Sequence, residues 1–322
     1  PMLIPECMTL LHLPFAALGM FVLLRREFAV RDIVALLAGL LWGFGTRMIA
    51  EQNHPMQIIQ LALLPWEVLL LMQSWRMWRG AVLLGLLFGV SFLAGQPQTF
   101  LFFALFMGTF TLAHAVGEQR ATGTRTALRP IAGFAFAMLI ATGIAMIQLL
   151  PSMELAALTG RHHLSYDEAT LGGLHLGYLI NWIVPKFFGE NPGFGLPVTP
   201  VTVDRFWYWE ATFYFTQIGE LLALFGLVAL WRERRRASDH REGSAHQRYL
   251  LFFTLFAGFA FLYGLGANLH LQWLFWRFVP FFDQIRAPGR MMWLLWFIGV
   301  LYAAVGAERF VMREGAAHGA GW

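Results

Sequence analysis

Long uninterrupted apolar runs constrain this chain more than any other feature of its sequence. They are roughly 14 to 21 residues long, and short clusters of charged residues separate them. A helix of about 20 apolar residues crosses the hydrocarbon core of a bilayer, and a shorter run needs only another turn at its ends. Backbone polar groups in lipid must be satisfied within the structure, so continuous apolar runs favour helices over a strand barrel. The sequence therefore predicts an all-α, polytopic membrane bundle.

We expect about nine transmembrane helices in a single transmembrane domain that covers residues 1–322. Charged residues make up 13% of the chain, about half the share of a soluble domain. The predicted spans are residues 8–24, 33–46, 57–72, 81–94, 99–115, 131–150, 211–231, 249–265 and 291–307. Two connections stand out: the long loop 151–210, and the aromatic segment 268–288, whose apolar residues recur at the spacing of an interfacial helix.

Basic residues divide unevenly between the two faces of the predicted bundle. Sixteen of the 23 lysine and arginine residues follow odd-numbered spans, and seven lie at the other face. Loops rich in basic residues stay in the cytoplasm, so this pattern places Pro1 and the loop 151–210 outside it. Topology accounts for the net charge of +4, and we predict no nucleic-acid partner.

The segment RAPGR directly precedes the ninth span. In it, Arg286 and Arg290 flank Pro288 and Gly289, and proline is well suited to the first turn of a helix. Helix N-termini attract phosphate, and arginine binds phosphate with two parallel hydrogen bonds. We therefore expect these arginines to bind a lipid-linked phosphate or pyrophosphate. The alternative is that they contact ordinary lipid headgroups or pair with Asp283.

Two other polar turns lie at the same predicted face. In GTRMIAEQNHP, Arg47, Glu51 and His54 would share one face if the second helix continued. Arg47 is a further candidate phosphate ligand, but an ion pair with Glu51 is the simpler explanation of this turn. His54 beside a carboxylate could instead form an acid–base pair. The turn GQPQ presents Gln96 and Gln98, whose amides suit sugar hydroxyls or a tight polar turn.

Carboxylates at or inside the membrane are the remaining candidates. Glu154 follows the sixth span and could act as a catalytic carboxylate or pair with Arg161, itself a candidate ligand. Glu67 and Glu220 lie nearer the apolar centre, where acidic residues mark a pathway or a buried hydrogen bond. The sequence leaves both alternatives open.

We predict no metal site and no specific cofactor. The single cysteine, Cys7, excludes an internal disulfide and a cysteine-based metal site. His162, His163 and His175 lack the spacing of converging zinc ligands. A divalent cation is compatible with a phosphate substrate, although no motif indicates one.

Four motifs occur in an order that resembles the YfhO family of bacterial membrane proteins. They are LLHLPFAALGMFVLLRR, LAGQPQTFLFFALF, QLLPSMELAALTGR and the segment that ends in RAPGR. That family is similar to the GT-C class of polytopic glycosyltransferases, which use polyprenyl-phosphate sugars at the outer face of the membrane. The resemblance implies a GT-C-like protein of the bacterial inner (cytoplasmic) membrane that takes a lipid-linked sugar for cell-envelope glycosylation. The positions within the matching motifs that could bind this substrate are Gln98, Glu154, Arg161, Arg286 and Arg290.

The resemblance also implies a catalytic acid in the first extracytoplasmic loop. The chain begins with Pro1 directly before its first span, so we expect an N-terminal part to be missing and the main carboxylate to lie upstream. Glu154, Glu51 and His54 are the weaker candidates within the chain.

Two other functions are compatible with the sequence. The first is a transporter or flippase of a lipid-linked or amphiphilic substrate, with Glu67 and Glu220 facing its path. The second is a non-catalytic membrane subunit of a larger complex, whose protein partners the sequence does not identify. Membrane lipids are expected partners in every case.

Overall fold

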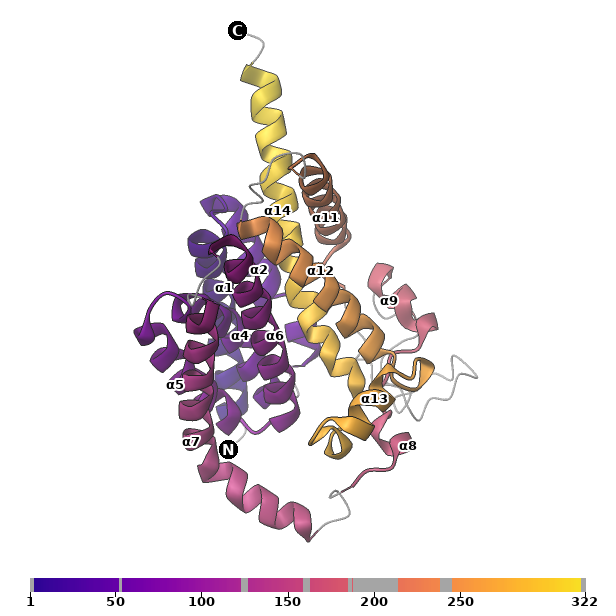
Figure 1. Cartoon of the computed structure of the whole chain (residues 1–322). Helices are drawn as coiled ribbons and strands as arrows, with labels where there is room; N and C mark the ends of the chain where they lie inside the picture. Colours follow the sequence, from indigo (N-terminus) through magenta and orange to yellow (C-terminus); the bar gives the residue numbers. More distant parts are fainter. Residues whose placement is uncertain are drawn as a thin grey trace.

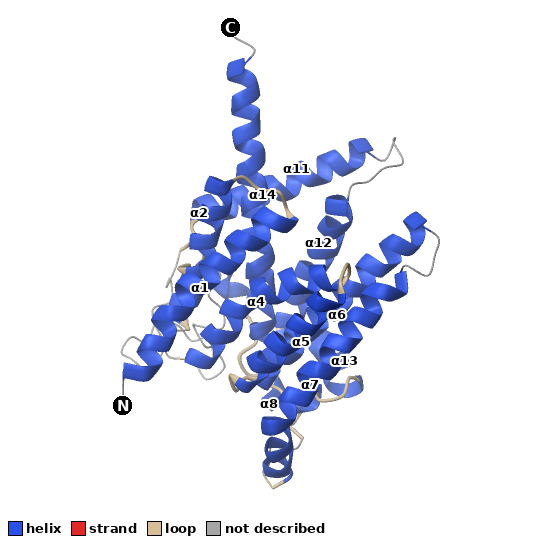
Figure 2. Cartoon of the chain, turned by 90° about the vertical axis from the view of Figure 1, so that its left-hand side faces the viewer, coloured by secondary structure: helices blue, strands red, loops and turns tan. Residues whose placement is uncertain are grey.

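The computed structural model describes residues 3–51, 54–122, 127–158, 163–184, 187, 214–237 and 245–319. Every regular element within these ranges is a helix (Figures 1 and 2). The expectation of an all-α polytopic membrane bundle is confirmed.

Each of the nine predicted spans overlaps a helix. These helices are α1 (Leu3–Glu27), α2 (Asp32–Gly43), α4 (Pro55–Ser74), α5 (Trp78–Leu93), α6 (Pro97–Thr122), α7 (Leu128–Ala157), α11 (Gln217–Ala237), α12 (Ala245–Gly264) and α14 (Met292–Gly319). Within the described ranges, six helical segments are long and apolar enough to cross a membrane, and α5 and α12 contribute shorter apolar helices. α11 ends in a run of arginines, and cations are favoured at a helix C-terminus by its dipole.

Short helices belong to the connections at one end of this bundle. They are α3 (Thr46–Ala50), α8 (Tyr166–Ala169), η3 (Leu176–Leu179), α9 (Ile180–Ile183), η5 (Gly266–Asn268), α13 (Leu271–Phe278), η6 (Phe282–Gln284) and η7 (Pro288–Met291). We name this end, where α8 and α13 lie in Figure 1, the α13 end. The helical spacing seen in the sequence is confirmed for α13, which packs Leu271 and Phe275 against the core and exposes Leu274 and Phe278.

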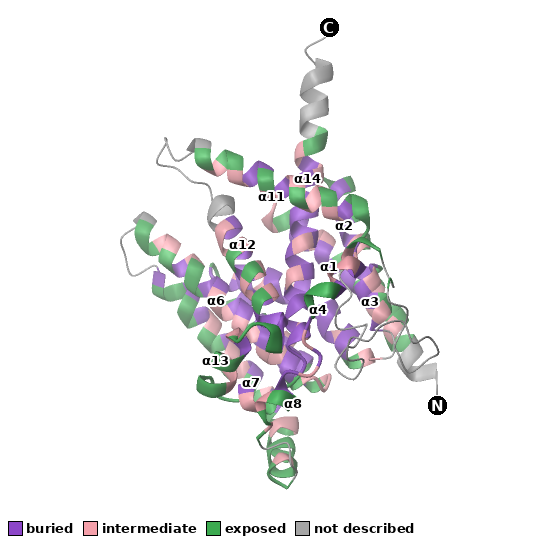
Figure 3. Cartoon of the chain, turned by 90° about the vertical axis from the view of Figure 1, so that its right-hand side faces the viewer, coloured by how far each residue is buried: buried purple, intermediate pink, exposed green. Residues whose placement is uncertain are grey.

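The helices α4 and α14 form the interior of the bundle. Of their apolar segments, 72% and 78% of the residues are buried, against 28% for α7, and buried residues run along both helices in Figure 3. α14 packs against α2, α11 and α12, whereas α4 packs against α1, α5 and α6. The outward faces carry large apolar side chains such as Leu139 and Ile147, which are 70% and 75% exposed. A soluble protein rarely exposes so much apolar surface, but lipid covers it readily.

The end of the sixth span differs from its prediction in a way that bears on a candidate residue. The sixth span was expected to end at residue 150, before Pro151, but α7 continues through Pro151 to Ala157. A proline inside a helix removes one backbone hydrogen bond and usually kinks or ends the helix. Only the last two turns follow this position, and they are exposed. Glu154 therefore lies on a helix and not in the loop predicted for it.

The pair α11 and α14 approach each other through their glycines. A Cβ atom added at Gly306 would lie 2.0 Å from the carbonyl oxygen of Leu222, and one added at Gly226 would lie 2.2 Å from that of Tyr302. Small residues let helix backbones meet closely inside a membrane, where packing drives association.

Replacing Gly306 or Gly226 by alanine should therefore push α11 away from α14. We expect each change to lower the free energy of unfolding by about 1–3 kcal/mol, as overpacking does, which SDS titration in mixed micelles would measure. Gly258→Ala is the matched control because nothing lies within 4 Å of a Cβ there, and alanine favours a helix by up to ~1 kcal/mol. Equal stabilities of the three variants would contradict this close crossing.

Candidate functional site

The segment RAPGR enters α14 through η7, whose first turn contains Pro288. The helix start predicted here is confirmed. Ala287 precedes it in the left-handed region, with φ of 60°, and is fully buried. Its N–H donates to the Leu171 carbonyl at 2.8 Å, and its carbonyl accepts from Gln98 Nε2 at 3.1 Å. Two distant parts of the chain therefore hold this strained residue in place.

The side chain of Arg290 connects this segment to the GQPQ turn. Arg290 is half-buried, and its Nη1 donates to Gln98 Oε1 at 3.1 Å and, at the long distance of 3.5 Å, to Gln96 Oε1. The turn is held in its place by Gln60 of α4, whose Nε2 donates to the carbonyls of Ser91 at 3.0 Å and Gln96 at 3.1 Å. Two motifs that were predicted separately thus form one cluster, in which neutral amide oxygens position a guanidinium.

Protein carbonyls already occupy the backbone donors at this helix start. The N–H of Gly289 donates to the Gly172 carbonyl at 3.3 Å, and the N–H of Arg290 donates within its own turn. A phosphate bound at this helix start would consequently accept hydrogen bonds from guanidinium groups more than from backbone N–H groups. Arg286 is exposed and Arg290 half-buried, so the two lie at different depths beside η7.

The turn between α3 and α4 gathers Arg47, Glu51 and His54. The second helix does not continue through these residues, since α2 ends at Gly43 and the separate short helix α3 ends at Ala50. The turn nevertheless places Arg47 Nη2 at 2.8 Å from Glu51 Oε1, and His54 Nδ1 at 3.2 Å from Glu51 Oε2. Arg47 and Glu51 are fully buried, and the Arg47 guanidinium lies 4.9 Å from the ring centroid of Trp293.

This burial favours the ion pair with Glu51 over phosphate binding as the role of Arg47. A guanidinium enclosed between a carboxylate and an indole ring serves structure more readily than binding of a lipid phosphate. Glu51 and His54 remain an acid–base candidate because half-exposed His54 faces a fixed carboxylate.

Four contributors to this site were missed by reasoning from the sequence. Trp293 covers Arg47, Gln60 fixes the GQPQ turn, and the carbonyls of Leu171 and Gly172 hold the RAPGR backbone. Gln60 carried a usable signal, as a polar residue inside an apolar span. The carbonyls of Leu171 and Gly172 gave no signal in the sequence, because a backbone contact depends on the fold and not on the residue type.

Other predicted site residues are not brought to this cluster. Glu154 lies exposed near the end of α7. Arg161 lies outside the described residues, so a pair between the two is not tested. Asp283, considered as a partner for the arginines, pairs with His163 Nδ1 at 2.5 Å.

The described part of the long loop supports the RAPGR segment. Trp276 of α13 donates to the Leu164 carbonyl at 3.0 Å, and Gln272 donates to the Ala169 carbonyl at 2.8 Å. α8 begins with a capping box in which the Ser165 hydroxyl and backbone N–H both bond to Glu168, and these hydrogen bonds lower the pKa of Glu168. Residues 164–169 are therefore held against α13 by side chains of that helix.

No group of three or more histidine, cysteine or acidic residues that could hold a metal ion occurs in the described ranges. No family model, curated protein or solved structure matches the chain. The structure itself defines the class: a polytopic, all-helical membrane protein with a polar, arginine-containing cluster at one end of its bundle.

Proposed function

We propose that this protein is a glycosyltransferase-like membrane protein whose α13 end binds the phosphate of a polyprenyl-linked sugar. One observation carries the proposal: Gln98 contacts both Arg290 and the backbone of Ala287, and so joins two of the four motifs on which the family resemblance depends. A guanidinium fixed in this way can bind phosphate with little loss of side-chain entropy.

The surroundings of Arg290 suit a lipid substrate. At the same end of the bundle, α13 exposes Trp273, Leu274 and Phe278, and Arg286 is exposed as well. Tryptophan and phenylalanine are favoured at the membrane interface, so a polyprenyl chain in the bilayer would bring its phosphate to the level of the arginines. In a transfer reaction, these arginines would stabilise the negative charge that develops on the departing phosphate.

The proposal includes a side of the membrane and a general base. The distribution of basic residues supports an extracytoplasmic α13 end in a bacterial inner membrane. A carboxylate would remove the proton from the acceptor hydroxyl as the anomeric carbon is attacked. Within the chain, Glu51 beside His54 is better positioned than Glu154, since Glu51 pairs with Arg47, which contacts Trp293 near the start of α14.

Binding of the donor is the direct test. The purified protein, incubated in micelles with a polyprenyl-phosphate sugar, should retain that lipid in native mass spectrometry and release its sugar to an acceptor in a transfer assay. Binding can be scored without transfer, so it does not depend on which carboxylate acts as base. Failure to retain any polyprenyl phosphate would contradict the proposal.

A transporter or flippase is the second candidate, and Glu67 is the observation that favours it. Glu67 lies in α4 and is fully buried. Ser91 of α5 lies beside it. A carboxyl group at this depth is costly unless it binds a proton or a substrate group that passes it. Glu220, by contrast, is half-buried in the first turn of α11.

Glu67→Gln should separate the two functions. The change conserves volume and removes only the ionisable group, so a transporter should lose most of its uptake of labelled substrate into vesicles, about 10-fold or more. A transferase should keep both donor binding and transfer. Asp167→Asn is the control, because Asp167 is an exposed carboxylate on α8. Unchanged uptake in the Glu67 variant would exclude the transporter role proposed for this residue.

A further inference from the structure

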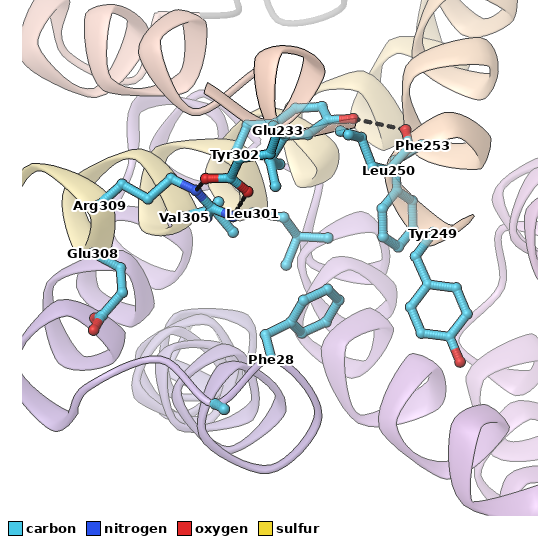
Figure 4. A pocket seen from close by; sticks show the side chains of 12 residues that line it. Phe28, Glu233, Tyr249, Leu250, Phe253, Leu301, Tyr302, Val305, Glu308 and Arg309 are labelled. Carbon is cyan, nitrogen blue, oxygen red and sulfur yellow. Dashed lines mark hydrogen bonds and ion pairs between the residues drawn. The ribbon is translucent and has the colours of Figure 1, made fainter. Parts of the chain in front are cut away.

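A cavity of about 370 Å³ lies at the end of the bundle opposite the α13 end. α11, α12, α14 and the turn after α1 surround it, as Figure 4 shows. Its apolar walls are Phe28, Leu230, Leu250, Phe253, Leu301 and Val305. The volume falls at the lower end of the range of small-molecule sites, so it can take one apolar chain but not a whole phospholipid.

Charged residues line one side of this cavity. Arg309 donates to both carboxylate oxygens of Glu233, from Nε at 2.8 Å and from Nη2 at 2.7 Å. Beside them, Glu308 is almost fully buried and lies 3.0 Å from Arg31 Nε. Glu233, Glu308 and Arg309 line the cavity, and Arg31, which pairs with Glu308 from outside the lining, brings the sum of their charges to zero.

Polarity changes along α14 in the direction of the membrane surface. Leu301 and Val305 lie deeper, within the predicted span, whereas Glu308 and Arg309 come after its last residue. Figure 4 shows the same separation, with Arg309 and Glu308 to one side of the apolar wall. An occupant therefore needs an apolar chain in the bilayer and a polar head at its surface.

We propose that this cavity binds a zwitterionic phospholipid with a primary ammonium, that is, phosphatidylethanolamine. One acyl chain fills the apolar part, the phosphate lies beside Arg309 and Arg31, and the ammonium lies beside Glu233 and Glu308. The headgroup of an anionic lipid has no cation that could interact with the carboxylates of Glu233 and Glu308. A choline head would place a cation there that cannot donate a hydrogen bond, whereas a primary ammonium has three donors. This site is independent of the function proposed for the α13 end.

The experiment compares three lipids on the delipidated protein. Phosphatidylethanolamine, phosphatidylcholine and phosphatidylglycerol with identical chains are added in micelles, and retained lipid is measured by native mass spectrometry. We expect phosphatidylethanolamine to bind about 10-fold more tightly than the other two, the factor that one charge-assisted hydrogen bond provides. Equal retention of the three lipids, or a preference for phosphatidylglycerol, would overturn the assignment.

Two variants locate the site. Glu233→Gln should abolish the preference for the ethanolamine head, with total lipid retention little changed, and it alters only a half-exposed side chain. Val305→Phe should lower retention of all three lipids by filling the cavity. Asp32→Asn, an exposed carboxylate outside the cavity lining, is the control for Glu233→Gln. A preference that survives Glu233→Gln would show that the lipid binds elsewhere.

Discussion

Replacing Arg290 by alanine should weaken binding of a polyprenyl phosphate, and any sugar transfer from it, by about 10²-fold or more. Loss of a single positioned donor to a developing oxyanion costs enzymes about 10²–10³ in rate. Arg290 is positioned by Gln98, so the guanidinium can be removed without changing the helices that surround it. Native mass spectrometry of the bound lipid and a transfer assay would measure the two effects.

Three further variants make this result specific to the geometry. Arg290→Lys should recover only part of the binding, because an ammonium lacks the planar fork of the guanidinium. Gln98→Ala should give a smaller loss, about 10-fold, by freeing Arg290 from its position. Arg277→Ala removes an exposed arginine from α13 at the same end of the bundle and should have little effect. If Arg277→Ala and Arg290→Ala weakened binding equally, general attraction to positive charge would explain it.

Replacing Glu51 by alanine should destabilise the protein by about 3–5 kcal/mol, the usual cost of leaving one member of a buried ion pair alone. Arg47 would keep its charge in a fully buried position against Trp293. SDS titration in mixed micelles would measure the free energy of unfolding.

The double variant Arg47→Met with Glu51→Leu should regain most of that stability, because it leaves no isolated charge. Asp32→Asn breaks the pair between Arg25 and Asp32, whose side chains are 42% and 74% exposed, and should cost less than about 1 kcal/mol. A double variant as unstable as Glu51→Ala would show that Arg47 and Glu51 do not act as a pair.

The fold could be predicted largely because bilayer thickness sets the length of a span. That constraint acts on each apolar run separately, so it required no knowledge of which helices touch. It did not reveal that α7 continues beyond Pro151, since proline statistics describe average helices and not this exposed end. It also did not reveal that α3 stops at Ala50 while its turn still brings His54 to Glu51.

The candidate site could be predicted only in pieces. Pro288 and its flanking arginines indicated a helix start, and the GQPQ turn indicated a polar cluster. Their contact through Gln98 depends on α6 lying beside η7, and this arrangement of the bundle is a long-range property that a single sequence does not contain. Glu154 illustrates the converse: its position within one of the four motifs suggested a role, but α7 places it at an exposed surface.

The way in which α14 is anchored has a mechanical consequence. Gln98 and the carbonyls of Leu171 and Gly172 bind the backbone of the segment that leads into α14. Further along, Gly306 of α14 is in close backbone contact with α11. α14 is therefore expected to stay fixed in any conformational change of the bundle, so that the other helices move relative to it. α7, whose apolar segment is mostly uncovered by protein, packs closely against α5, so these two helices would have to move together.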